Sequence, residues 1–169
     1  MSDISTSKGG RVAQKSAIFF TLPSHREPNW RLTKAKEGSV GVDVLLAAHE
    51  RMCSSNFFIL NLTPILFQIL EQEDRIEEED FTRVIKYCAL ELHMFDEVLF
   101  QKGMLFSISF LRYFEAAGLF RNRKYKAKEI LRCVNHYRPS VPPLTLEDEL
   151  EIIASADDSP PSTSDNLPF

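Results

Sequence analysis

Residues 77–95, EEEDFTRVIKYCALELHMF, decide the fold class of this chain. Their apolar side chains recur at the three- and four-residue spacing of one helix face: Phe81, Val84, Ile85, Cys88, Ala89, Leu92 and Phe95. Four acidic residues at 77–80 supply the negative charge that stabilises a helix N-terminus. The pattern predicts a long amphipathic helix, which we extend to residues 77–101.

The same stretch carries a second apolar strip, formed by Tyr87, Leu90 and Met94 on the opposite side of the predicted helix. A helix that is apolar on two sides is either the central member of a bundle or presents one side to a partner. Both interpretations stay open from the sequence, and the strip is our first candidate for partner binding.

Capping signals extend the helical prediction along the chain. Thr63 before Pro64 is typical of an N-cap followed by a first helical residue. Gly118 is suited to end one helix, and Asn122 to cap the next. Thr145 with Asp148 resembles a capping box. Together these signals predict helices over residues 42–53, 63–72, 77–101, 104–117, 122–137 and 145–154, and hence a mainly α, single-domain helical bundle.

A small sheet is the alternative to this all-helical prediction. Phe106, Ile108 and Phe110 alternate with the period of a strand, and Lys102-Gly103 would suit the turn of a hairpin that starts at residues 98–100. Short apolar islands at four places would then make an α+β or α/β fold, namely residues 17–22, 40–44, 57–62 and 97–110.

Composition divides the chain into three parts. The 169 residues are 44% hydrophobic and 26% charged, the balance of a globular protein of one domain. Residues 1–38 are rich in Ser, Thr, Lys and Arg, which predicts a flexible basic arm. Residues 155–169 combine Pro, Ser and Asp, which predicts a disordered acidic tail. The helical domain is expected over residues 39–154.

The chain lacks the motifs of the common enzyme classes. Its six glycines form neither a nucleophile elbow, nor a P-loop, nor a dinucleotide-binding loop. We therefore expect no enzyme activity and no cofactor. Three widely spaced cysteines and the absence of an apolar leader predict an intracellular protein, cytoplasmic or nuclear, with reduced thiols. The longest apolar run, residues 57–70, is too short and too interrupted to cross a membrane.

One metal site can be drawn from helical spacing. His49 with Cys53, and Cys133 with His136, would each share a helix face and together make a tetrahedral set. Eighty residues separate the two pairs, whereas structural zinc sites have short ligand spacings. We therefore interpret these residues as core thiols and partly exposed histidines, and predict no metal site.

Basic charge is concentrated in one segment. Residues 112–138 contain eight Lys or Arg against two Glu, a local net charge of +6 in a chain whose total is −4. On a helix over residues 122–137, Lys124, Lys128 and Arg132 would form one stripe. This segment either pairs with the acidic residues 71–80 and 147–158 of the same chain or binds phosphate groups together with the N-terminal arm. The candidate nucleic-acid-binding residues are Arg121, Arg123, Lys124, Lys128 and Arg132.

The C-terminal residues 144–153, LTLEDELEII, are acidic and amphipathic, so they predict either the last helix of the domain or a helix that docks on a partner. Our leading expectation is a non-enzymatic interaction or adaptor protein that binds a protein partner, with homo-oligomers possible. Its predicted contact residues are Tyr87, Leu90, Met94, Leu146, Leu150 and Ile153. The alternative is a nucleic-acid-binding regulator that uses residues 122–137 and the N-terminal arm.

Overall fold

The computed structural model describes residues 28–147 and confirms a mainly α fold. Within these residues there are six α-helices, a π-helical turn and one two-stranded antiparallel sheet. The elements are, in chain order, α2 (Pro28–Ser54), β1 (Leu60–Asn61), α3 (Pro64–Ile69), η1 (Leu70–Asp74), α4 (Glu78–Leu90), α5 (Glu97–Gln101), β2 (Met104–Leu105), α6 (Ile108–Ala116) and α7 (Ala127–His136).

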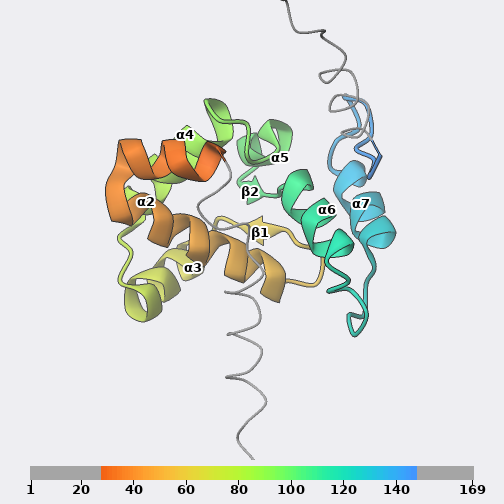
Figure 1. Cartoon of the computed structure of the whole chain (residues 1–169), viewed down its shortest axis with the longest axis horizontal. Helices are drawn as coiled ribbons and strands as arrows, with labels where there is room; N and C mark the ends of the chain where they lie inside the picture. Colours follow the sequence, from red (N-terminus) through yellow and green to blue (C-terminus); the bar gives the residue numbers. More distant parts are fainter. Residues whose placement is uncertain (1–27, 148–169) are drawn as a thin grey trace, which may run out of the picture.

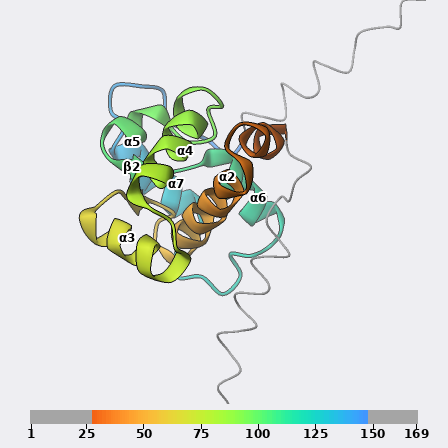
Figure 2. The same ribbon diagram turned by 90° about the vertical axis from the view of Figure 1, so that its left-hand side faces the viewer.

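The long helix α2 crosses the middle of the domain, with α4 and α3 on one side and the pair α6 and α7 towards the other end (Figures 1 and 2). The sheet lies between these groups and contacts α2 through β1. A single cluster of buried apolar side chains joins all of these elements, and Phe58, Phe81 and Phe106 are among its largest fully buried members. The aromatic residues of this chain therefore mainly build its core.

Helix α2 begins well before the boundary predicted for the helical domain. The composition of residues 28–37 predicts a flexible arm, but these residues form the first part of α2, in which Trp30 and Thr33 are buried. Gly38, at φ 67° and ψ −150°, interrupts the helical geometry, and the two halves of α2 meet there at an angle (Figure 2). Burial of Trp30 and Thr33 in the tertiary structure orders a stretch that its composition alone would leave unfolded.

The helix predicted over residues 77–101 is divided in two. Helix α4 ends at Leu90, and the chain turns through His93 at φ 51° while the Met94 N–H donates to the Cys88 carbonyl at 2.9 Å. Asp96 then caps α5, because its carboxylate accepts from the Leu99 N–H at 3.0 Å. An N-cap aspartate inside the predicted helix is the local signal that the periodicity analysis missed.

The proposed hairpin over residues 97–110 is wrong, although its turn exists. Residues 97–101 are helical, and β2, directly after the turn at Lys102-Gly103, pairs with the distant β1 in the register Leu60 to Leu105. Two of the four predicted strand islands thus contribute to the sheet. Residues 40–44 are helical, and residues 17–22 lie outside the described part.

The caps of the remaining helices agree with the sequence in part. Thr63 caps α3 as predicted, accepting from the Leu66 N–H at 3.3 Å, and Gly118, at φ 70°, follows α6. Asn122 does not cap α7. That helix begins at Ala127, where the Glu129 carboxylate accepts from the Lys126 N–H at 2.8 Å. The predicted capping box at Thr145 involves residue 148, which lies outside the described residues.

Candidate partner-binding surface

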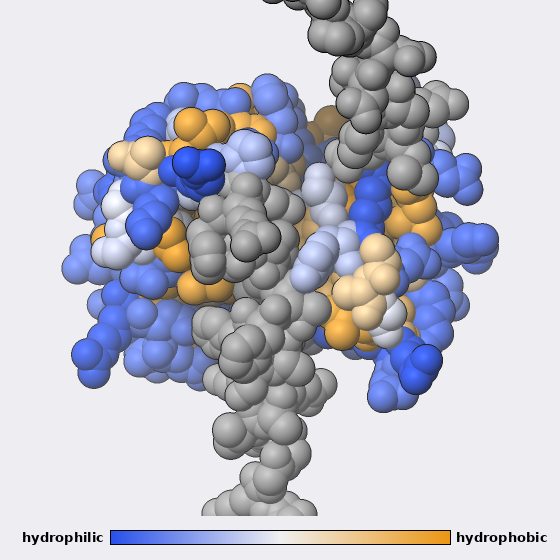
Figure 3. Space-filling view, in the orientation of Figure 1, coloured by the Kyte–Doolittle hydropathy of each residue, from blue (hydrophilic) through white to orange (hydrophobic). Residues whose placement is uncertain are grey.

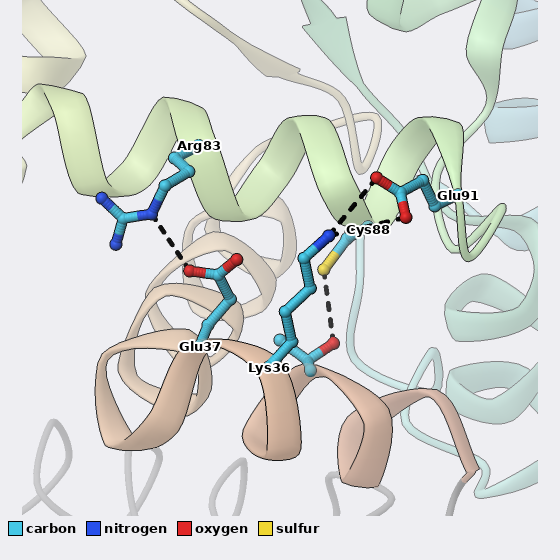
Figure 4. Close-up of polar contacts among 6 residues, drawn as sticks. Lys36, Glu37, Arg83, Cys88 and Glu91 are labelled. Atoms are coloured by element: carbon cyan, nitrogen blue, oxygen red, sulfur yellow. Dashed lines mark hydrogen bonds and ion pairs between the residues drawn. The ribbon is translucent and has the colours of Figure 1, made fainter.

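The first half of α2 lies against α4 (Figure 4), and it contacts one residue of the predicted second apolar strip, Tyr87. Lys36 reaches across from α2, with its Nζ 3.7 Å from the centre of the Tyr87 ring and 3.4 Å from a carboxylate oxygen of Glu91. A cation over an aromatic face is attracted by the ring quadrupole. Tyr87 is consequently half-buried beneath a side chain of its own chain.

Two more contacts attach this segment to α4. Arg83 donates through Nε to Glu37 at 3.0 Å (Figure 4), and within α4 it also forms an ion pair with Asp80 at 2.7 Å. One turn earlier on α2, the Thr33 hydroxyl and the Cys88 thiol are 3.4 Å apart in a buried contact. The polar pairs lie at the surface and the Thr33 contact inside, so the segment is joined to α4 across its full width.

The three predicted contact residues do not form one stripe. Leu90, at the end of α4, is 36% exposed, whereas Tyr87 is partly covered by Lys36. Met94 lies beyond the helix, is half-buried, and lines a small cavity of about 70 Å³ together with Trp30 and His49. Of the predicted strip, Leu90 is therefore the residue that is most open to a partner.

The sequence analysis missed Leu32, which is 49% exposed on the first half of α2. Leu32 precedes Lys36 by one turn, and Leu90 follows Tyr87 by almost one turn, so each shares a helix face with a member of the cation–π contact. The two helices are antiparallel here, because Asn29 donates to the Leu92 carbonyl while Glu37 contacts Arg83. Leu32 and Leu90 therefore lie next to this contact at the same end of the helix pair, one on each helix, and we call Leu32, Lys36, Tyr87 and Leu90 the α2–α4 surface.

The C-terminal candidate site is described only in part. Leu146 is half-buried and packs against the core, and the preceding Leu144 exchanges two hydrogen bonds with the Asn135 side chain at 2.8 and 3.0 Å. This segment is therefore attached to α7 up to residue 147. Leu150 and Ile153 lie outside the described residues.

The basic segment is divided between structural and exposed cations. Arg123, a candidate phosphate ligand, is half-buried, donates to the carbonyls of Cys53 and Ser55, and lies about 5 Å from the rings of Phe58 and Phe114. Burial lowers the pKa of the Arg123 guanidinium. These contacts anchor the loop between α6 and α7 to the end of α2.

Other cations of the segment also serve the fold. Lys126 donates to three carbonyls of that loop, at 2.7 to 3.2 Å. Arg138 forms a buried ion pair with Asp96 at 2.9 Å. Arg112 donates to the Thr145 carbonyl at 2.8 Å. Half of the eight basic residues therefore hold the domain together.

The predicted stripe of three cations is reduced to two on the helix. Lys124 precedes α7, which leaves Lys128 and Arg132 one turn apart on its exposed face. Arg121 and Lys124 are exposed in the preceding loop, and Lys124 lies 5.2 Å from the Tyr125 ring. Within residues 28–147, none of these four cations forms an ion pair.

The acidic residues 71–80 have partners other than the basic segment. Arg51, at the end of α2, binds Glu73 at 3.1 Å and Asp74 at 2.5 Å beside an open groove of about 580 Å³. Asp80 pairs with Arg83 on α4. In the described part of the chain, no intramolecular pairing between residues 71–80 and α7 is found.

Two of the four residues considered as metal ligands, His49 and Cys53, are buried in the core. Burial raises the pKa of the Cys53 thiol to about 12 and lowers the pKa of His49 to about 4. His49 is thus fully buried rather than partly exposed as expected, whereas Cys133 is half-buried and His136 is exposed. Across residues 28–147, no three potential ligands gather closely enough to hold a metal ion.

The same residues include no helix that is both long and apolar enough to span a bilayer. Comparisons with protein family models, with curated proteins and with solved structures find no match to this chain.

Proposed function

We propose that this chain is a non-enzymatic binding protein whose partner is an amphipathic helix that docks on the α2–α4 surface. The observation that carries the proposal is the placement of two exposed leucines, Leu32 on α2 and Leu90 on α4, at the same end of the contact between Lys36 and Tyr87. Apolar side chains clustered beside an aromatic ring are typical of the energetic centre of a protein interface.

The charges beside the leucines specify the partner further. Lys36 follows Leu32 by one turn on α2, and the exposed Lys86 precedes Leu90 by one turn on α4. A partner helix that places two apolar side chains over the leucines and carboxylates towards the two lysines is complementary to this surface. The proposed partner is therefore apolar on one face and acidic at the edges of that face.

The test is selection of peptides from a displayed library of amphipathic helices with the purified chain as bait. Selected peptides are expected to be acidic at the edges and to bind the double variant Leu32→Asp, Leu90→Asp at least about tenfold more weakly, because each aspartate places a charge against an apolar contact. Ile65→Asp is the matched control, since Ile65 on α3 is the most exposed apolar residue described, at 68%. Peptides that bind the double variant normally, or that need Ile65, would refute the proposal.

A second candidate function is binding of a nucleic acid backbone by Arg121, Lys124, Lys128 and Arg132. It is favoured by their exposure and by the absence of ion pairs to them within residues 28–147. Anisotropy of labelled RNA and DNA at about 50 and about 200 mM salt tests it, because phosphate contacts weaken steeply over that range.

Binding is expected to be lost in Lys128→Glu, Arg132→Glu and kept in the control Lys86→Glu, which carries an exposed lysine on α4. If no oligonucleotide binds at the lower salt concentration, this second candidate is rejected. If both variants bind alike, the contact lies elsewhere on the chain.

A further inference from the structure

We propose that two copies of this chain exchange residues 28–37 about Gly38, so that this segment of each copy packs on α4 of the other. The partner of the interface is then a second copy of the chain, and the contacts on α4 are those already seen within one copy. The inference needs no outside partner, so it is independent of the proposed function.

The hinge is a single residue. Gly38, at φ 67° and ψ −150°, is in a region of conformational space that is essentially restricted to glycine, and the residues on both sides are helical. A Cβ at Gly38 would meet no atom within 4 Å, so the requirement for glycine is conformational and not steric. When Gly38 is helical instead, the 27 residues of α2 become one straight helix about 40 Å long.

A second glycine depends on the same bend. A Cβ on Gly41 would lie 2.7 Å from the Cβ of Glu37 and 3.1 Å from the Thr33 carbonyl oxygen. In a regular helix the Cβ atoms of residues four apart are about 5–6 Å apart. The close approach therefore exists only in the bent form, and a side chain at residue 41 is compatible only with the straight one.

The segment on the far side of the hinge packs on α4 and, through Trp30, on His49 in the second half of α2. It carries buried Trp30 and Thr33, and beside them Glu37, whose partner Arg83 belongs to α4, and Lys36, whose partner Glu91 is the C-cap of α4. These contacts lie beyond the bend, and they are equally available to the same segment of a second copy. Exchange of an identical element retains its interactions and removes the bend, so the dimer forms at a low cost in free energy.

The exchange is measured with a disulfide that reports which chain supplies the segment. The Thr33 hydroxyl oxygen is 3.4 Å from the Cys88 sulfur, so Thr33→Cys brings a thiol to within a small shift of a disulfide. Because Cys88 and residue 33 are buried in the folded chain, the protein is refolded from urea with oxidised glutathione as the oxidant, and Cys133→Ser removes the half-buried thiol from the background. A closed copy forms the bond within one chain, whereas an exchanged dimer forms it between two chains, as a reducible dimer on a denaturing gel.

Gly38→Ala and Gly41→Ala are expected to raise the interchain share at a given protein concentration, because both favour the straight helix. Helix propensity alone makes the straight helix about fivefold more favourable with alanine than with glycine in each chain. A dimer contains two straightened helices, so its dissociation constant is expected to fall by about 25-fold. Ser39→Ala is the matched control, since Ser39 is exposed, helical and adjacent to the hinge. It is expected to behave like the parent chain.

The parent Thr33→Cys chain gives the second measurement, which does not depend on whether the glycine variants fold. Its interchain share must rise as the chain concentration during oxidative refolding is increased, and no bond must form when Cys88 is replaced by Ala. A bond that stays within one chain at all concentrations overturns the proposal. It is equally overturned if folded Gly38→Ala is monomeric, or if it dimerises while its disulfide stays within one chain.

Discussion

Acidification from about pH 7.5 to about pH 5 is expected to lower the free energy of unfolding by about 2 kcal/mol through His49 alone. His49 lies in the core, with ring centroids of Trp30, Phe95 and Phe110 at 5.4, 5.8 and 4.5 Å. Its Nδ1 and the Leu45 carbonyl oxygen are 2.7 Å apart, so Nδ1 is the protonated nitrogen of the neutral ring. A charged imidazole in this aromatic environment would lose its hydration without gaining an acidic partner.

The sign and magnitude follow from the two pKa values of His49. Burial lowers the pKa from 6.5 to about 4, and the Leu45 hydrogen bond opposes this only partly. Between these two pH values the unfolded chain binds more protons than the folded chain. The contribution of neutral His49 to stability is therefore fully present above pH 6.5 and is lost as the pH falls towards 4. The full difference between the two pKa values corresponds to about 3.4 kcal/mol of unfolding free energy. Most of this free energy is lost between about pH 6 and about pH 4, and each pH unit in that range removes a similar part of it.

Urea unfolding at a series of pH values measures this loss. Trp30 is the single tryptophan of the chain and lies against His49, so its fluorescence reports unfolding of the region concerned. His49→Gln is expected to flatten the profile between pH 6.5 and 5, whereas His93→Gln, at an exposed histidine that lines the same cavity, is expected to leave it unchanged. A parent profile that is flat, or one that is equally steep in His49→Gln, would show that burial of His49 does not control acid stability.

Three further predictions concern residues that hold the domain together. Asp96→Ala is expected to lower the free energy of unfolding by about 3–5 kcal/mol, because it leaves the buried Arg138 without its ion pair and removes the cap of α5. Asp96→Asn keeps a capping oxygen and should lose less stability; an equal loss in both variants would contradict the role of the cap. Arg123→Ala is expected to cost about 2 kcal/mol and the exposed Arg121→Ala less than about 0.5 kcal/mol in the same unfolding assay; equal losses would contradict a structural role for Arg123. With a disulfide reagent at about pH 8, at most one of the three thiols, Cys133, should react in the folded chain, whereas all three should react in urea. The reason is that burial raises the pKa of Cys53 to about 12 and that of Cys88 to about 11. Rapid reaction of a second thiol in the folded chain would contradict that burial.

The fold class was predictable because it depends on periodicity and on local chemistry. The apolar repeat that starts at Phe81 becomes the buried face of α4, and the Thr63-Pro64 pair starts α3 as its cap chemistry requires. Both signals act within one or two turns of a helix, so a single sequence contains them in full. The mainly α prediction is therefore confirmed.

The exact ends of the helices were less predictable, since periodicity continues through a break. Leu92 and Phe95 keep the spacing of the α4 repeat, although the chain leaves the helix at Leu90 and turns through His93. Phe95 is buried from a loop position, because the core selects apolar side chains whatever backbone carries them. Asp96 was the available signal, as an N-cap that marks a new helix.

The candidate surfaces were also predictable only in part. Charge counting identified the basic segment, yet it could not separate Arg123, which is bound to carbonyls of α2 and the following loop, from the exposed Lys128. Likewise, the apolar strip of α4 is visible in the sequence, but Leu32 falls in the predicted flexible basic arm, and nothing in the sequence connects it with the strip. Which side chains remain exposed depends on contacts between segments more than fifty residues apart.

The sequence by itself determined the helices of the core, the caps at Thr63 and Gly118, and the concentration of basic charge in residues 112–138. These properties arise from side-chain spacing and from interactions between near neighbours along the chain. Tertiary structure alone decided the bend at Gly38, the burial of His49 and the cover that residues 28–37 place over α4. Each of these results from packing between distant segments, where burial of a few side chains outweighs the local preference of the backbone.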